Sequence, residues 1–113
     1  MYKVTFYTLF SGKSPIKEFI ISCHKSIRSK IARQIRYLKE FGLTLANPNL
    51  KKITGTKLWE IRILGRDSVR IICMAMVNNE VVIVHIFKKK GNKMPERDLN
   101  IALNRYKHLT TDI

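Results

Sequence analysis

The sequence that decides the fold runs from residue 57 to residue 90 and reads KLWEIRILGRDSVRIICMAMVNNEVVIVHIFKKK. It contains three apolar runs of strand length, at 57–63, 68–74 and 81–87, and each is rich in β-branched residues. Gly65-Arg66-Asp67 and Asn78-Asn79 separate the runs, and both have the composition of hairpin turns. The stretch therefore predicts an antiparallel meander of three strands.

Charged residues interrupt these apolar runs at only a few positions. Because side chains alternate between the two faces of a strand, Glu60 and Arg62 share one face of the first run. Trp59 and Ile61 lie on the opposite face of the same run. Arg70 is the only charged residue of the second run. A polar side chain in an otherwise apolar strand needs a partner or a function, so the meander carries a candidate site.

The composition limits the possible partners. With 113 residues the chain is expected to form one domain, spanning residues 1–113. Its 22 Lys and Arg against 8 Asp and Glu give a net charge of +14, which favours nucleic acid as the partner. A membrane surface is the less favoured alternative. No apolar run approaches the roughly 20 residues of a membrane span, and the start of the chain lacks the apolar core of a signal peptide.

The remaining elements follow from the hydrophobic pattern. Residues 2–9 predict a first strand, and residues 15–23 predict a short helix that begins at Ser14-Pro15. A longer helix is expected over 25–41, an irregular connection over 43–56, and a last helix from Pro95 onward. The order β-α-α-β-β-β-α predicts an α+β domain with helices packed on one face of a small antiparallel sheet.

The long predicted helix is amphipathic and has a basic side. Its apolar residues follow the helical period: Ile27, Ile31, Ile35, Leu38 and Phe41. Its other face carries five cations: Arg28, Lys30, Arg33, Arg36 and Lys39. Such a stripe is more often a solvated face than a binding surface, and both interpretations stay open.

The sequence predicts neither a cofactor nor a metal site. It has no Walker loop, no glycine-rich dinucleotide motif and no Cys or His cluster with metal-ligand spacing. Cys23 and Cys73 are interpreted as two reduced thiols of a cytoplasmic protein, since only His24 is a ligand-like neighbour. His85, in an apolar strand, is interpreted as a hydrogen-bonded core histidine rather than a proton-transfer group.

The charged residues of the meander suit metal-free cleavage of RNA. One set among them, a carboxylate and five cations, carries this prediction: Glu60, Arg62, Arg70, Lys88, Lys89 and Lys90. In that reaction the 2′-hydroxyl attacks the adjacent phosphorus, so the site needs a base for its proton and cations for the charge of the phosphorane. It also needs an acid for the departing 5′-oxygen.

Several short motifs together resemble a known family over essentially the whole chain. They are KLWEIR (57–62), VRI (69–71), FKK (87–89), Pro95-Glu96 and Ala102. They resemble the phage-derived Gp49-like/HigB branch of the RelE/ParE toxin superfamily. The resemblance implies the toxin of a type II toxin–antitoxin system, an mRNA endoribonuclease that acts on the ribosome and causes growth arrest.

The resemblance also implies the partners and leaves two alternatives. A small antitoxin, often of helix-turn-helix fold, neutralises such a toxin, and DNA is then contacted only through the antitoxin. A ParE-like inhibitor of DNA gyrase without catalytic activity remains the main alternative. A basic nucleic-acid-binding module without toxicity is the second.

The resemblance assigns roles to individual residues. Arg70 corresponds to a phosphate-stabilising arginine, and Lys88 and Lys89 match a basic pair after the last strand. Glu60 and Arg62 fall where RelE-type toxins have two cations, so Glu60 is either a base or the ion-pair partner of an arginine. The C-terminal tyrosine of RelE-type toxins has no match here. Further contacts with nucleic acid are expected from neighbouring lysines: Lys51, Lys52, Lys57, Lys90 and Lys93.

Overall fold

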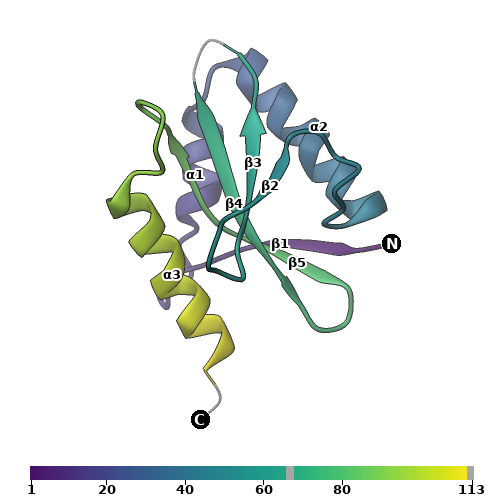
Figure 1. Cartoon of the computed structure of the whole chain (residues 1–113), viewed down its shortest axis with the longest axis vertical. Coiled ribbons are helices and arrows are strands. Elements are labelled where there is room, and N and C mark those ends of the chain that lie inside the picture. The colour runs from purple at the N-terminus through teal and green to yellow at the C-terminus, as the bar shows by residue number, and fades with distance from the viewer. Residues whose placement is uncertain (66–67, 112–113) are drawn as a thin grey trace.

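The chain forms five strands and three helices, which a computed structural model describes for residues 1–65 and 68–111. In chain order they are β1 (Lys3–Phe6), α1 (Pro15–Ser22), α2 (Lys25–Phe41), β2 (Leu50–Lys52), β3 (Trp59–Ile63), β4 (Val69–Met76), β5 (Glu80–Lys88) and α3 (Glu96–Thr110). The strands make one sheet in the order β1-β5-β4-β3-β2 (Figure 1). None of the described helices is long and apolar enough to span a bilayer.

Strands β3, β4 and β5 form the predicted antiparallel meander. The hairpin between β4 and β5 turns at Asn78 and Asn79, whose φ angles of 61° and 57° are those that a type I′ turn requires. The other predicted turn is described only at Gly65, because Arg66 and Asp67 lie outside the described residues. The meander is thus confirmed wherever the structure describes it.

The rest of the sheet differs from the prediction in two respects. Strand β1 pairs with β5 in parallel, so the sheet is mixed rather than antiparallel. Residues 50–52, expected to be irregular, form β2 against β3. In this strand Leu50 is buried, while Lys51 and Lys52 are exposed. Three residues are too few for an alternating pattern to stand out in the sequence.

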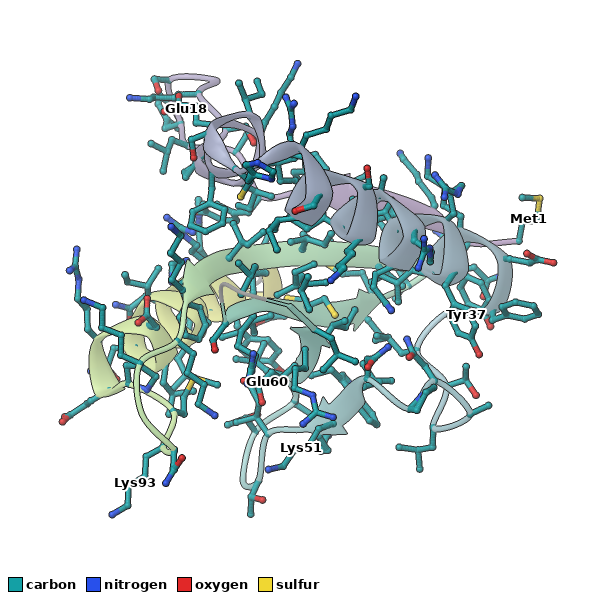
Figure 2. The ribbon with its side chains drawn as sticks, turned by 90° about the horizontal axis from the view of Figure 1, so that it is seen from above. Met1, Glu18, Tyr37, Lys51, Glu60 and Lys93 are labelled. Atoms are coloured by element: carbon teal, nitrogen blue, oxygen red, sulfur yellow. The ribbon has the colours of Figure 1, made fainter. Side chains whose placement is uncertain are left out.

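The helices cover both faces of the sheet. Helix α2 packs against β1 and β3 through its buried Ile27, Ile31 and Leu38. Helix α3 packs against β5, where Asp98 bonds to His85. His85 is in register with Ile72 and, through it, with Glu60, so the three side chains share one face of the sheet. Figure 2 shows Glu60 on the side of the sheet away from α2, so α3 lies on the face opposite to α2. The α+β class is confirmed, while the position of α3 differs from the prediction that all helices pack on one face.

Polar contacts attach α3 to the sheet. His85 Nε2 lies 2.7 Å from Asp98 Oδ1, so the predicted hydrogen bond of this histidine is confirmed, while the residue is half-buried rather than part of the core. The register between β4 and β5 shifts beside His85 and leaves Val84 without an opposite residue in β4. Arg105 Nη1 donates to the carbonyl oxygen of Val84 over 2.8 Å. These bonds hold α3 against β5, on the same face of the sheet as the charged residues of β3 and β4.

Candidate functional site

The candidate site is a hollow of about 180 Å³ on the face of the sheet away from α2. Figure 2 shows Glu60 and Lys51, two of its residues, on the side of the sheet opposite to α1 and α2. The residues that line it come from four segments of the chain: Pro48, Asn49, Leu50, Lys51, Glu60, Arg62, Arg70 and Lys89. Four cations therefore surround one carboxylate.

The strand register brings these charges together. Arg62 lies directly opposite Arg70 in the ladder of β3 and β4, and Lys51 lies opposite Glu60 in the ladder of β2 and β3. Directly opposed side chains share a face and have Cβ atoms about 5 Å apart. Like charges in such a pair destabilise a sheet, so the two arginines favour an anion between them.

Glu60 and Arg70 form an ion pair inside the hollow. Glu60 Oε2 and Arg70 Nε are 3.6 Å apart, which is too long for a hydrogen bond. Both groups are largely buried, with 10% of the Glu60 side chain and 14% of the Arg70 side chain exposed. Within the described residues, Glu60 Oε2 is buried without any hydrogen-bond partner. A buried carboxylate oxygen normally accepts a hydrogen bond, so the charge of Glu60 is only partly compensated in this structure.

The two ends of the site are held by backbone bonds. The backbone N–H of Arg62 donates to the carbonyl of Asn49 over 2.9 Å, which joins the turn before β2 to β3. The backbone N–H of Lys89 donates to the carbonyl of Ser68, which fixes the end of β5 beside the start of β4. The side chain of Arg62 is exposed, whereas Lys89 is half-buried. Arg62 thus stands at the rim of the hollow and Lys89 deeper in its wall.

Other predicted site residues lie elsewhere. Lys88 pairs with Val69, which pairs with Ile63, so Lys88 belongs to the face that α2 covers. Lys52 is opposite Trp59, and its Nζ lies 4.8 Å from the centroid of that ring. The remaining lysines are exposed and do not line the hollow: Lys57, Lys90 and Lys93. Figure 2 shows Lys93 well apart from Glu60.

Asn49 was missed as a site residue, because Asn47-Pro48-Asn49 looks like turn punctuation alone. Asn47 Oδ1 accepts a hydrogen bond from the backbone N–H of Asn49 over 3.0 Å, and this local turn presents Asn49 to the site. The only signal in the sequence is the side-chain turn that an asparagine favours. No cluster of three or more potential metal ligands is found among residues 1–65 and 68–111.

Comparisons with known proteins agree with this fold. The model of the family described as phage-derived Gp49-like proteins matches residues 18–107. The structure is similar to that of a mutant of the Escherichia coli toxin RelE in its free state, with a TM-score of 0.64 and 16% sequence identity. That likeness covers 92% of this chain and 96% of the RelE chain and concerns the fold. No curated protein matches the chain. The predicted resemblance is thereby confirmed.

Proposed function

Because the chain belongs to the family of phage-derived Gp49-like proteins and has the fold of RelE, we propose that it is the toxin of a type II toxin–antitoxin system. It cleaves mRNA without a metal, on the ribosome, and so inhibits translation. The observation that carries the proposal is the buried carboxylate of Glu60, which lies in a hollow lined by Arg62, Arg70 and two lysines.

The two arginines hold the phosphate that is attacked. Arg62 and Arg70 face each other across the ladder, so a phosphate between them meets two guanidinium groups. Arg70 uses Nη1 for the carbonyl of Val69 over 3.2 Å, and this bond orients its planar group. As the phosphorane forms, negative charge builds on the oxygens that the guanidinium groups contact. Donors already in position stabilise that charge without rearrangement.

Glu60 removes the proton from the 2′-hydroxyl. Its side chain lines the hollow and is 10% exposed, so a hydroxyl bound in the hollow can approach the carboxylate for proton transfer. The 2′-oxygen then bonds to phosphorus while the bond from phosphorus to the 5′-oxygen breaks. We assign to Lys89 the proton that the 5′-oxygen takes up. The products are a 2′,3′-cyclic phosphate and a free 5′-hydroxyl.

A small antitoxin with an acidic surface, of helix-turn-helix type, is the proposed partner. The net charge of +14 speeds encounter with an acidic protein and with ribosomal RNA alike. Within the described chain only two Lys or Arg side chains form ion pairs, Lys13 with Glu18 and Arg70 with Glu60, so most of that positive charge is unpaired. Binding of an antitoxin that covers part of it would relieve the self-repulsion of the toxin.

The test is expression of the chain alone in bacteria, followed by mapping of mRNA 5′ ends. We expect growth arrest, new 5′ ends within coding regions, and relief by co-expression of the neighbouring gene. Glu60→Gln should abolish the new ends, and Lys88→Gln, on the other face of the sheet, should leave them unchanged. Growth arrest with DNA-damage signalling and intact mRNA would contradict the proposal and indicate an inhibitor of DNA gyrase instead. Normal growth would reject a toxin altogether.

A further inference from the structure

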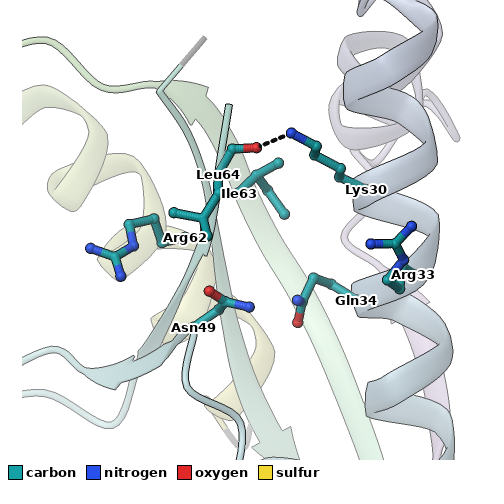
Figure 3. Close-up of a pocket in the computed structure, with 7 residues that line it drawn as sticks. All are labelled: Lys30, Arg33, Gln34, Asn49, Arg62, Ile63 and Leu64. Carbon is teal, nitrogen blue, oxygen red and sulfur yellow. Dashed lines mark hydrogen bonds between the residues drawn. The ribbon is translucent and has the colours of Figure 1, made fainter. Parts of the chain in front are cut away.

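A second hollow, of about 260 Å³, lies between α2 and the edge of β3 (Figure 3). We call it the α2 groove. One wall is made by side chains of α2, and the other by the end of β3 and the turn before β2. The residues that matter for its chemistry are Lys30, Arg33, Gln34, Asn49, Arg62 and Leu64.

The α2 groove is positively charged. Lys30 and Arg33 contribute cations from α2, and none of the described residues that line the groove is a carboxylate. Neither of these two side chains forms an ion pair within residues 1–65 and 68–111. A concave surface lined by positive charges concentrates the electrostatic field and raises the local concentration of anions. The basic side of α2, which the sequence leaves open as a solvated face or a binding surface, thus includes part of a hollow.

Hydrogen bonds fix the width of the groove at both ends. At one end Lys30 Nζ donates to the carbonyl of Leu64 over 2.7 Å. At the other end the buried Asn47 donates through Nδ2 to Gln34 Oε1 over 3.0 Å, and Asn47 also accepts from the backbone of Asn49. These bonds connect α2 to β3 and to the turn before β2. The groove is therefore pre-organised, which reduces the entropy lost on binding.

The groove continues from the candidate site. Asn49 and Arg62 line both hollows. In Figure 3 the guanidinium of Arg62 points away from α2, toward the candidate site, while Asn49 and Gln34 lie between β3 and α2. A chain that leaves the candidate site past Asn49 meets the α2 groove next. Its volume is near the lower end, roughly 300 Å³, of pockets for small ligands, so it accommodates one residue of a polymer rather than a folded segment.

We propose that the α2 groove is a subsite for single-stranded RNA that holds the nucleotide next to the cleaved one, with its phosphate on Arg33. This inference rests on the proposed function, because the RNA enters the groove from the cleavage site. The amide groups of Asn49 and Gln34 offer donors and acceptors to the base or the sugar. An acidic segment of a protein partner is the competing occupant, and continuity with the candidate site favours RNA.

The test compares two arginines on the same helix. Arg33 lines the groove, whereas Arg28 is exposed on α2 and does not line it. Binding of a 2′-O-methylated hexanucleotide, which cannot be cleaved because the attacking oxygen is blocked, is measured by fluorescence anisotropy over a range of salt. Arg33→Gln should weaken binding by about three- to tenfold and reduce the salt slope by about 0.7, the value for one phosphate of a single strand. Arg28→Gln should match the wild type.

A length series gives a second measurement. The side-chain amide signals of Gln34 and Asn49 should shift in NMR spectra with a 2′-O-methylated trinucleotide, and Gln34 should respond little to a dinucleotide. Equal effects of Arg33→Gln and Arg28→Gln, with mRNA cleavage in cells intact, would overturn the subsite and leave the proposed function standing. Loss of antitoxin affinity in Arg33→Gln with unchanged RNA binding would instead assign the groove to the partner. Absence of mRNA cleavage by the wild type would remove both proposals.

Discussion

Arg62 and Arg70 lie directly opposite each other on the face of the sheet away from α2. The register places two arginines next to each other on one face, and Glu60, the only carboxylate among the described residues that line the hollow, is ion-paired with Arg70. Repulsion between the arginines makes the free site electrostatically costly. A phosphate that enters the site offsets this repulsion, so the arrangement of the charges favours its binding.

Replacing Arg70 by alanine should separate chemistry from folding. Because its contact strengthens as charge builds on the phosphorane, we expect Arg70→Ala to reduce the cleavage rate by about 10²-fold or more. Arg70→Lys should recover little, since a point charge cannot reproduce the planar fork. Cleavage, antitoxin binding and melting temperature are measured on the same preparation. If Arg70 is needed mainly to neutralise Glu60, its loss lowers the free energy of unfolding by about 3–5 kcal/mol, and the melting temperature collapses.

Glu60→Gln tests the assignment of the base. Glutamine keeps the shape of the side chain but cannot take up the 2′-hydroxyl proton, so cleavage should fall by about 10²- to 10⁴-fold. Affinity for a non-cleavable RNA should stay the same or rise, because a negative charge is removed from a site for phosphate. The measurements are single-turnover cleavage and RNA binding. A fully active Glu60→Gln variant would leave Glu60 only as the ion-pair partner of Arg70.

Lys88 and Lys89 form a matched pair for the role of charge. They are neighbours in sequence, but only Lys89 lines the candidate site. We expect Lys89→Gln to weaken RNA binding and to reduce the salt slope by about 0.7. If Lys89 is also the acid, the cleavage rate of bound RNA falls as well. Lys88→Gln should behave like the wild type in both assays. Indistinguishable variants would mean that the lysines act only through net charge.

The stability of the fold should depend on His85 at mildly acidic pH. Burial lowers the pKa of His85 from its ordinary 6.5, and the hydrogen bond to Asp98 offsets this only in part. The unfolded chain therefore binds a proton at a higher pH than the folded chain, and the free energy of unfolding decreases as pH falls below about 6.5. Urea unfolding across pH 5 to 8 measures this slope. His85→Gln should flatten it, and a slope that persists unchanged would assign it to other groups.

Much of the fold is predictable because its signals are local. The φ-positive turn at Asn78-Asn79 and the cap at Ser14 need only their own sequence, and Ser14 Oγ does accept from the backbone N–H of Lys17 over 3.1 Å. The shared face of Glu60 and Arg62 follows from the alternation within one strand. By contrast, β2 is too short to show a pattern, and its pairing with β3 brings Lys51 opposite Glu60.

The remaining parts of the site depend on contacts between distant segments. Which of Lys88 and Lys89 faces the hollow is decided by the pairing of β5 with β4, including the register shift beside His85. The sequence of the lysine triplet alone therefore does not predict which lysine faces the hollow. The α2 groove likewise exists only because Asn47 and Leu64 bond to α2. In the sequence, Asn47 belongs to an ordinary turn and Leu64 to an ordinary strand end, so neither indicates a contact with α2.

The parallel pairing of β1 with β5 has a consequence for the synthesis of the protein. Lys3 pairs with Glu80 and Phe6 with Ile83, so the first strand cannot join the sheet until residues 80–83 have left the ribosome. Contacts between such distant residues slow folding, because the entropy of closing a long loop is lost before the stabilising contacts form. During translation the meander hairpins can form before the N-terminal segment pairs with β5. The parallel pairing of β1 therefore makes the first strand to be synthesised the last to join the sheet.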